Sequence, residues 1–127
     1  MYIRFETKLT FKNTDCRKGV FAAMGDVKKK GTMSLAEHVW YINTANGLNK
    51  YLQIPDCYNQ PMLNHVIFKT HCWFKCNGKS IKYIDKALAV SKLLRAHDIL
   101  VIVHVDHYLD NIIYEDDVQV VTRTGFL

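Results

Sequence analysis

The densest group of reactive side chains is the segment 71–76, which reads HCWFKC. A cysteine thiol becomes a nucleophile when a neighbouring cation or a helix N-terminus lowers its pKa, and His71 and Lys75 lie close to Cys72 in sequence. No nucleophile elbow or oxyanion-hole signature accompanies this group. A free cysteine beside two aromatic residues is more often part of a core, so we expect a structural role, and a Cys–His nucleophile is the alternative.

A second group lies in the segment 104–110, HVDHYLD. His104 and Asp106 would share one face of a strand, and a histidine with a carboxylate can bind a divalent metal or transfer protons. A complete site would need further ligands, for which His71 and Cys72 are the candidates. We expect instead a polar strand end that leads into a loop. The sequence therefore predicts no catalytic residue, no metal site and no cofactor, and a metal- or Cys-dependent hydrolase is kept as a second alternative function.

Charge is distributed unevenly along the chain. Residues 1–95 hold 16 Lys and Arg against 6 Asp and Glu, a balance of +10, whereas residues 96–127 hold one Arg against six acids, a balance of −5. A basic body can attract an acidic partner, although surface charges also scatter without function. An acidic turn, EDD, lies between two strand patterns, where Asp is favoured because its side chain bonds to the backbone.

Lysines and aromatic residues are interleaved in the basic part of the chain. A basic surface with exposed aromatic side chains such as Trp73, Phe74 and Tyr83 suits phosphate contact and base stacking. The first predicted helix also ends in three lysines, where they suit the negative end of the helix dipole. The candidate binding residues are Lys28, Lys29, Lys30, Trp73, Lys75, Glu115, Asp116 and Asp117.

Seven elements must position these side chains. Two-residue alternation predicts strands over 2–11, 99–105, 111–115 and 118–123, and three- to four-residue spacing predicts helices over 19–30, 34–52 and 79–97. The segment 65–74 is ambiguous between a strand and a helical turn, and 53–64 is expected to be a loop. Together these elements predict one α+β domain over residues 1–127, with a mainly antiparallel four-stranded sheet and three helices packed on one face.

Several local features refine this fold. Ser34 and Glu37 have the spacing of a capping box at the start of the second helix. In that helix Leu35, Val39 and Ile42 recur at helical spacing, so we expect them on its apolar face. The central core is expected to contain an alternating strand face and a helix stripe, namely Ile99, Val101 and Val103 with Leu88 and Leu94.

The sequence resembles a family of short bacterial proteins to which no function is assigned. The similar segments run in order along most of the chain: IRFET from Ile3, GVF from Gly19, WFK from Trp73, Leu93-Leu94 with His97, and YEDD with QVV from Tyr114 to Val121. In the similar sequences a residue such as Gly usually follows the histidine, and here that position is Asp98. The resemblance implies a small α+β domain of bacteria and their phages. It supplies no activity and no catalytic residue.

These observations favour a binding protein over an enzyme. No apolar run approaches the roughly 20 residues of a membrane span, and the N-terminal segment MYIRFETKL has no signal-peptide core, so we expect a cytoplasmic protein with free cysteines and no membrane contact. The first hypothesis is a non-enzymatic interaction protein that binds a protein partner through its charged faces; in a phage it would be an inhibitor of a host system. The alternative is a nucleic-acid-binding protein that uses a basic face. The sequence leaves the oligomeric state open.

Overall fold

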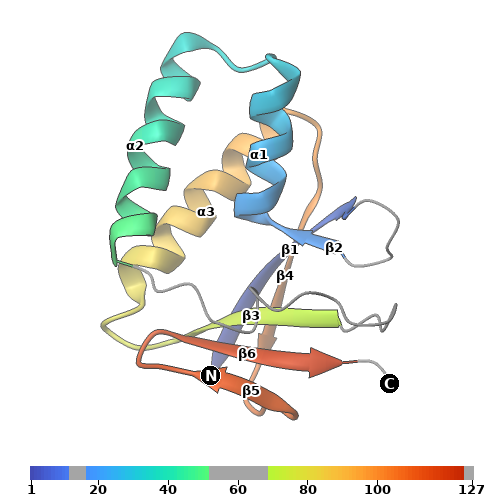
Figure 1. Cartoon of the computed structure of the whole chain (residues 1–127), viewed down its shortest axis with the longest axis vertical. Coiled ribbons are helices and arrows are strands. Elements are labelled where there is room, and N and C mark those ends of the chain that lie inside the picture. Colours follow the sequence, from blue (N-terminus) through green and yellow to red (C-terminus); the bar gives the residue numbers. More distant parts are fainter. Residues whose placement is uncertain (12–16, 52–68, 125–127) are drawn as a thin grey trace.

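The computed structural model describes residues 1–11, 17–51 and 69–124 (Figure 1). It confirms an α+β fold with three helices and an antiparallel sheet, but the sheet has six strands rather than four. Among the described residues, no helix has the length and apolar character needed to cross a membrane. In chain order the elements are β1 (Tyr2–Thr10), β2 (Arg17–Gly19), α1 (Val20–Lys30), α2 (Leu35–Tyr51), β3 (Lys69–Lys75), α3 (Ile81–Ala96), β4 (Val101–Asp106), β5 (Ile112–Glu115) and β6 (Gln119–Thr124).

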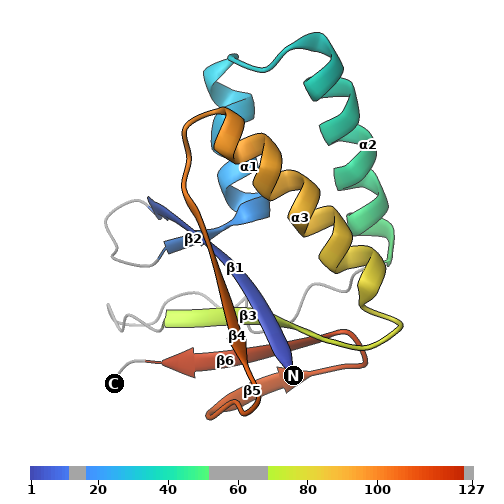
Figure 2. The same ribbon diagram turned by 180° about the vertical axis from the view of Figure 1, so that it is seen from behind.

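Strand β1 is the centre of the sheet, because it pairs with three other strands. One edge pairs with β4 from Tyr2 to Thr7. The opposite edge is shared, since β3 pairs at Tyr2 and Ile3 and β2 pairs at Glu6 and Thr10. Beyond β3 the order continues through β6 to β5. In Figures 1 and 2, β1 and β4 run across the direction of β3, β6 and β5, so the sheet bends where β1 begins.

The two additional strands come from segments that the sequence left unassigned. β2 has only three residues, too few for an alternating pattern, and it leads directly into α1. β3 resolves part of the ambiguous segment 65–74 as a strand that pairs with β6 along its length. The expected loop over 53–64, residues 65–68, Cys16 and Cys57 lie outside the described residues.

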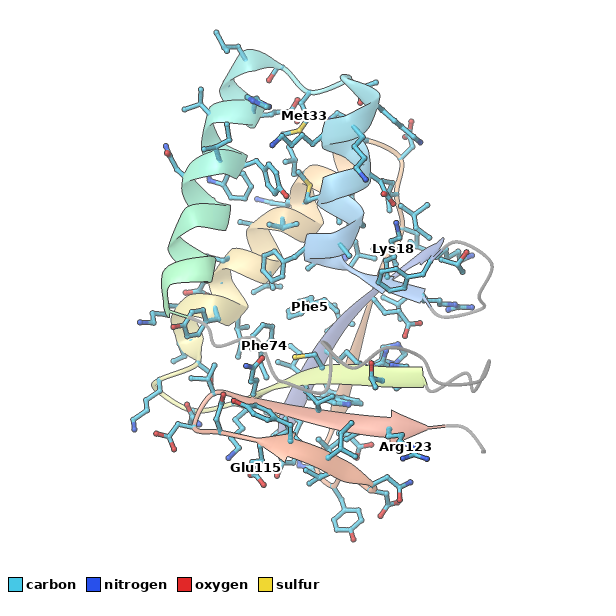
Figure 3. All side chains as sticks on the ribbon, viewed as in Figure 1. Phe5, Lys18, Met33, Phe74, Glu115 and Arg123 are labelled. Atoms are coloured by element: carbon cyan, nitrogen blue, oxygen red, sulfur yellow. The ribbon has the colours of Figure 1, made fainter. Side chains whose placement is uncertain are left out.

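The main core lies between the sheet and helices α1 and α3. Figure 3 shows Phe5 and Phe74 pointing from the sheet toward the helices. Leu94 and Val101 are buried as predicted. The buried members of this core are Phe5, Val20, Ala23, Met24, Val27, Phe74, Tyr83, Ala87, Val90, Leu94 and Val101, with Ile99 partly buried against them.

Two of the predicted core residues are exposed. Leu88 is 47% exposed because α3 turns Tyr83, Ala87, Val90 and Leu94 inward, and Leu88 is one position off that stripe. Val103 is 39% exposed, whereas Val101 on the same face of β4 is 4% exposed. The helical layer therefore covers only the beginning of β4.

Helix α2 is oriented differently from the sequence prediction. Leu35, Val39 and Ile42 are exposed, at 80%, 50% and 37%. The inward face instead presents Tyr41, which packs against the core, and Thr44, which is buried. Leu35, Val39 and Ile42 therefore face away from the core.

The N-terminus of α2 explains this orientation. The capping box forms as predicted: the N–H of Ser34 donates to Glu37 Oε1 over 2.9 Å, and the N–H of Glu37 donates to Ser34 Oγ over 3.1 Å. The other carboxylate oxygen of Glu37 lies 3.0 Å from His97 Nε2. Because His97 follows α3, this contact joins the Glu37 side of α2 to the end of α3.

Helix α3 ends with a residue in the left-handed conformation. Asp98 has a φ of 62°, and the next N–H, that of Ile99, bonds back to the carbonyl of Leu94 over 2.9 Å. This arrangement terminates a helix and favours glycine, which has no Cβ to clash.

Candidate functional site

The acidic turn between β5 and β6 is built around Asp116. Its Oδ1 accepts hydrogen bonds from the N–H groups of Val118 and Gln119, both at 2.8 Å, and the hydroxyl of Tyr114 donates to its Oδ2 over 2.7 Å. Burial acts to raise the pKa of Asp116, but the hydrogen bonds outweigh burial and hold this pKa below its ordinary value. Asp116 therefore organises the turn.

The other two acids of this turn have cationic partners in the same chain. Glu115 forms an ion pair with Lys75 at 2.6 Å, and Asp117 forms one with Lys79 at 2.9 Å. The structure thus brings together Lys75 and the acidic turn, which were separate candidates in the sequence. Glu115 and Asp117 are therefore paired with cations, whereas Asp116 accepts hydrogen bonds from uncharged groups.

The aromatic residues of the basic segment are buried. Trp73, Phe74 and Tyr83 are only 8%, 7% and 3% exposed. Trp73 packs with Leu109 on the face of the sheet away from the helices, and its indole N–H donates to Thr122 Oγ1 over 3.2 Å. The expectation that these three side chains form an exposed stacking surface is wrong.

Lys28, Lys29 and Lys30 lie at the exposed C-terminus of α1. Gly31 ends this helix with a φ of 69°, and Lys28 lies 5.9 Å from the ring centre of Tyr41 on α2. Helix α3 ends at the same end of the helical layer, as Figures 1 and 2 show and as the contact between His97 and Glu37 requires. It adds two exposed cations, so we define the basic end as Lys28, Lys29, Lys30, Lys92 and Arg95.

A second charged group, which the sequence did not single out, lies on the sheet face away from the helices. Glu6 is at its centre, and its side chain is only 9% exposed. Arg4 forms an ion pair with one carboxylate oxygen, Arg17 donates to the other over 3.1 Å, and His104 Nε2 lies 3.7 Å from it. The guanidinium of Arg4 also lies 5.0 Å from the ring centre of Trp73.

The pKa of Glu6 reflects this environment. Burial acts to raise it, but the hydrogen bonds and charges of Arg4 and Arg17, together with His104, outweigh burial and lower it. Alternating charged residues at positions 4 and 6 of an apolar strand were the one available signal for this group. We name it the Glu6 cluster: Arg4, Glu6, Arg17 and His104.

The remaining candidate groups do not converge on a metal site in the part of the chain that the structure describes. His104 and Asp106 share a face of β4, as predicted, but Asp106 accepts a hydrogen bond from the N–H of Tyr108 over 3.2 Å. Cys72 Sγ contacts Gln119 Oε1 at 3.4 Å, and Cys76 is exposed. Among the described residues, no three His, Cys, Asp or Glu side chains are placed to hold a metal ion.

No family model matches this chain, and no match is found among curated proteins or solved structures. The resemblance to short bacterial proteins therefore stays a prediction.

Proposed function

We propose that this chain is a non-catalytic binding protein, and that its basic end docks on an acidic surface of a protein partner. The observation that carries the proposal is the distribution of neutralised and unneutralised charge. Among the described residues, Lys29, Lys30, Lys92 and Arg95 form no ion pair, whereas the acids of the β5–β6 turn all have partners in their own chain.

The local charge at the basic end is strongly positive. The basic end has five cations and two nearby acidic residues, Glu37 and Asp98. The carboxylate of Glu37 already contacts Ser34 and His97. A concentration of one sign of charge raises the association rate with an oppositely charged partner. The lysines also suit a helix C-terminus, as does Arg95 in the last turn of α3, but that role does not explain Lys92 or why both helices bring their cations to the same end of the molecule.

A protein partner is favoured over single-stranded nucleic acid by the burial of the aromatic residues. Binding of single strands without sequence preference combines a positive surface with aromatic side chains on which bases stack. Trp73, Phe74 and Tyr83 do not supply such a platform, because each is packed in a core. Lysines alone provide charge complementarity, which suits an acidic protein surface.

The test is affinity capture from a lysate of the native host, with and without nuclease, on three forms of the protein. These are the wild type, a triple variant in which Lys28, Lys29 and Lys30 are replaced by Gln, and a control in which Lys8, Lys79 and Lys82 are replaced by Gln. Both variants lose the same net charge, but the control residues lie outside the basic end.

We expect one nuclease-resistant partner that the wild type and the control capture and the basic-end variant does not. Its association rate should fall as salt rises, because exposed charges are screened beyond about 8 Å at physiological ionic strength. If both variants lose capture of the partner to the same extent, the effect comes from net charge and not from the basic end. Capture that nuclease abolishes would favour nucleic acid instead.

A further inference from the structure

We propose that the Glu6 cluster is an anion-binding site that takes the phosphate group of a small phosphorylated molecule. The site is separate from the basic end. Ile3, Phe5 and Leu9 of β1 belong to the core beneath the helices. Arg4 and Glu6 alternate with these residues, so they project from the opposite face of the sheet.

The cluster contains more positive than negative charge. Glu6 is a single carboxylate, and it contacts two guanidinium groups and one imidazole. The group therefore carries a charge of +1 when His104 is neutral and +2 when His104 is protonated. A phosphate monoester, which carries a charge of about −1.5 to −2 near neutral pH, would neutralise this positive charge.

Arg4 and Glu6, the buried members of the cluster, hold the donor side chains in place. Arg4 is 13% exposed on its side chain, and it is held between the carboxylate of Glu6 and the ring of Trp73. Glu6 in turn holds Arg17 and approaches His104. Three strands contribute, since Arg17 comes from β2, His104 from β4 and the other two from β1.

Arg17 and His104, the more exposed members of the cluster, have nitrogen atoms that do not bond to Glu6. The side chain of Arg17 is 47% exposed and contacts Glu6 through one nitrogen only, and that of His104 is 36% exposed. Two buried nitrogens, Arg4 Nε and His104 Nε2, have no hydrogen-bond partner among the residues that the structure describes. Buried polar atoms are almost always paired, so a further partner is expected for these two nitrogens.

The direction of the donors favours a phosphate over a carboxylate. Guanidinium groups bind both, but a carboxylate is planar and offers two oxygens. The donors here come from side chains on three strands, and a phosphate monoester offers them three terminal oxygens where a carboxylate offers two.

The experiment is a titration followed by nuclear magnetic resonance, with inorganic phosphate, glycerol 3-phosphate and acetate as probes at constant ionic strength. The proteins are the wild type, Arg17→Gln, His104→Gln, and Lys82→Gln as a control for loss of one surface charge outside both the Glu6 cluster and the basic end. A second readout is the fluorescence of Trp73 in a Trp40→Phe background, since Trp73 lies beneath Arg4 and the chain has two tryptophans.

We expect saturable changes at the Glu6 cluster with either phosphate, and weaker ones with acetate. Loss of a charge-assisted hydrogen bond should weaken binding by about 10- to 100-fold in Arg17→Gln, with a smaller loss in His104→Gln and none in Lys82→Gln. Tighter binding of glycerol 3-phosphate would identify an ester as the ligand, and equal binding would identify the free ion. Changes that do not saturate, equal binding of acetate, or equal weakening in Lys82→Gln would overturn the proposal.

Discussion

Two leucines of α3 test the orientation of this helix, because they are chemically identical and differ only in burial. Leu94 is fully buried in the core, whereas Leu88 is 47% exposed. Replacing Leu94 with Ala removes apolar surface and leaves a cavity, which costs about 2–5 kcal/mol. Replacing Leu88 with Ala removes a partly hydrated group without a cavity and gains helix propensity, so its cost is about 1 kcal/mol or less.

The two losses of stability correspond to different decreases in the melting temperature. A domain of 127 residues has an unfolding entropy of roughly 270 cal/mol/K near its midpoint, so each kcal/mol lowers the melting temperature by about 4 °C. Leu94→Ala should therefore melt about 7–19 °C below the wild type, and Leu88→Ala about 4 °C below or less. Thermal and urea unfolding followed by circular dichroism would measure both. Equal destabilisation of the two variants, with unchanged urea m-values, would refute the placement of α3.

Three further predictions concern the helix end, the Glu6 cluster and the acidic turn. Asp98→Gly should stabilise the domain by about 0.5–1 kcal/mol in urea unfolding, because Asp98 has a φ of 62° and glycine adopts that conformation without strain. The pKa of Glu6 is lowered from 4.5 by folding, so its contribution to stability is present above that pH and is lost as the pH falls through the lower folded-state value. Melting temperatures measured from pH 6 down to about pH 2 should consequently decline less steeply in Glu6→Gln than in the wild type. Asp116→Ala should cost about 1–3 kcal/mol because the turn N–H groups of Val118 and Gln119 lose their acceptor, and Asp116→Asn, which keeps a carbonyl oxygen, should cost less. Equal losses in these two variants would show that the turn does not depend on that acceptor.

The sequence predicts an element well where its periodicity is long and its ends carry signals. Helix α1 ends at Gly31 after three lysines, and α2 begins at the Ser34–Glu37 capping box, as expected. The β5–β6 hairpin was predicted from its acidic turn, and Asp116 makes the backbone contacts that such a turn requires. In these segments the bonds that decide the structure connect residues a few positions apart, so a local pattern contains them.

The failures arise where distant contacts decide the structure. The contact between Glu37 and His97 joins residues 60 positions apart, and it turns the stripe of Leu35, Val39 and Ile42 outward although helical spacing alone favoured burial. The Glu6 cluster likewise assembles residues from three strands, one of which is too short to recognise from its pattern. The candidates that were adjacent in sequence, such as Trp73 and Lys75, were easier to notice, but Trp73 is a core residue.

Strand β4 has a consequence for the behaviour of the protein in concentrated solution. It pairs only with β1 among the described strands, and its uncovered part carries Val103 and Val105, which are 39% and 56% exposed, with neither lysine nor proline along its six residues. Such an edge is a template for intermolecular pairing that many proteins block with charge. Here the protection comes from repulsion between whole molecules, whose net charge of +5 disappears near the isoelectric point of about 9.0. Turbidity should therefore be greatest in mildly alkaline, high-salt buffers, and low-salt storage near neutral pH, where the net charge is +5, should keep the protein monodisperse.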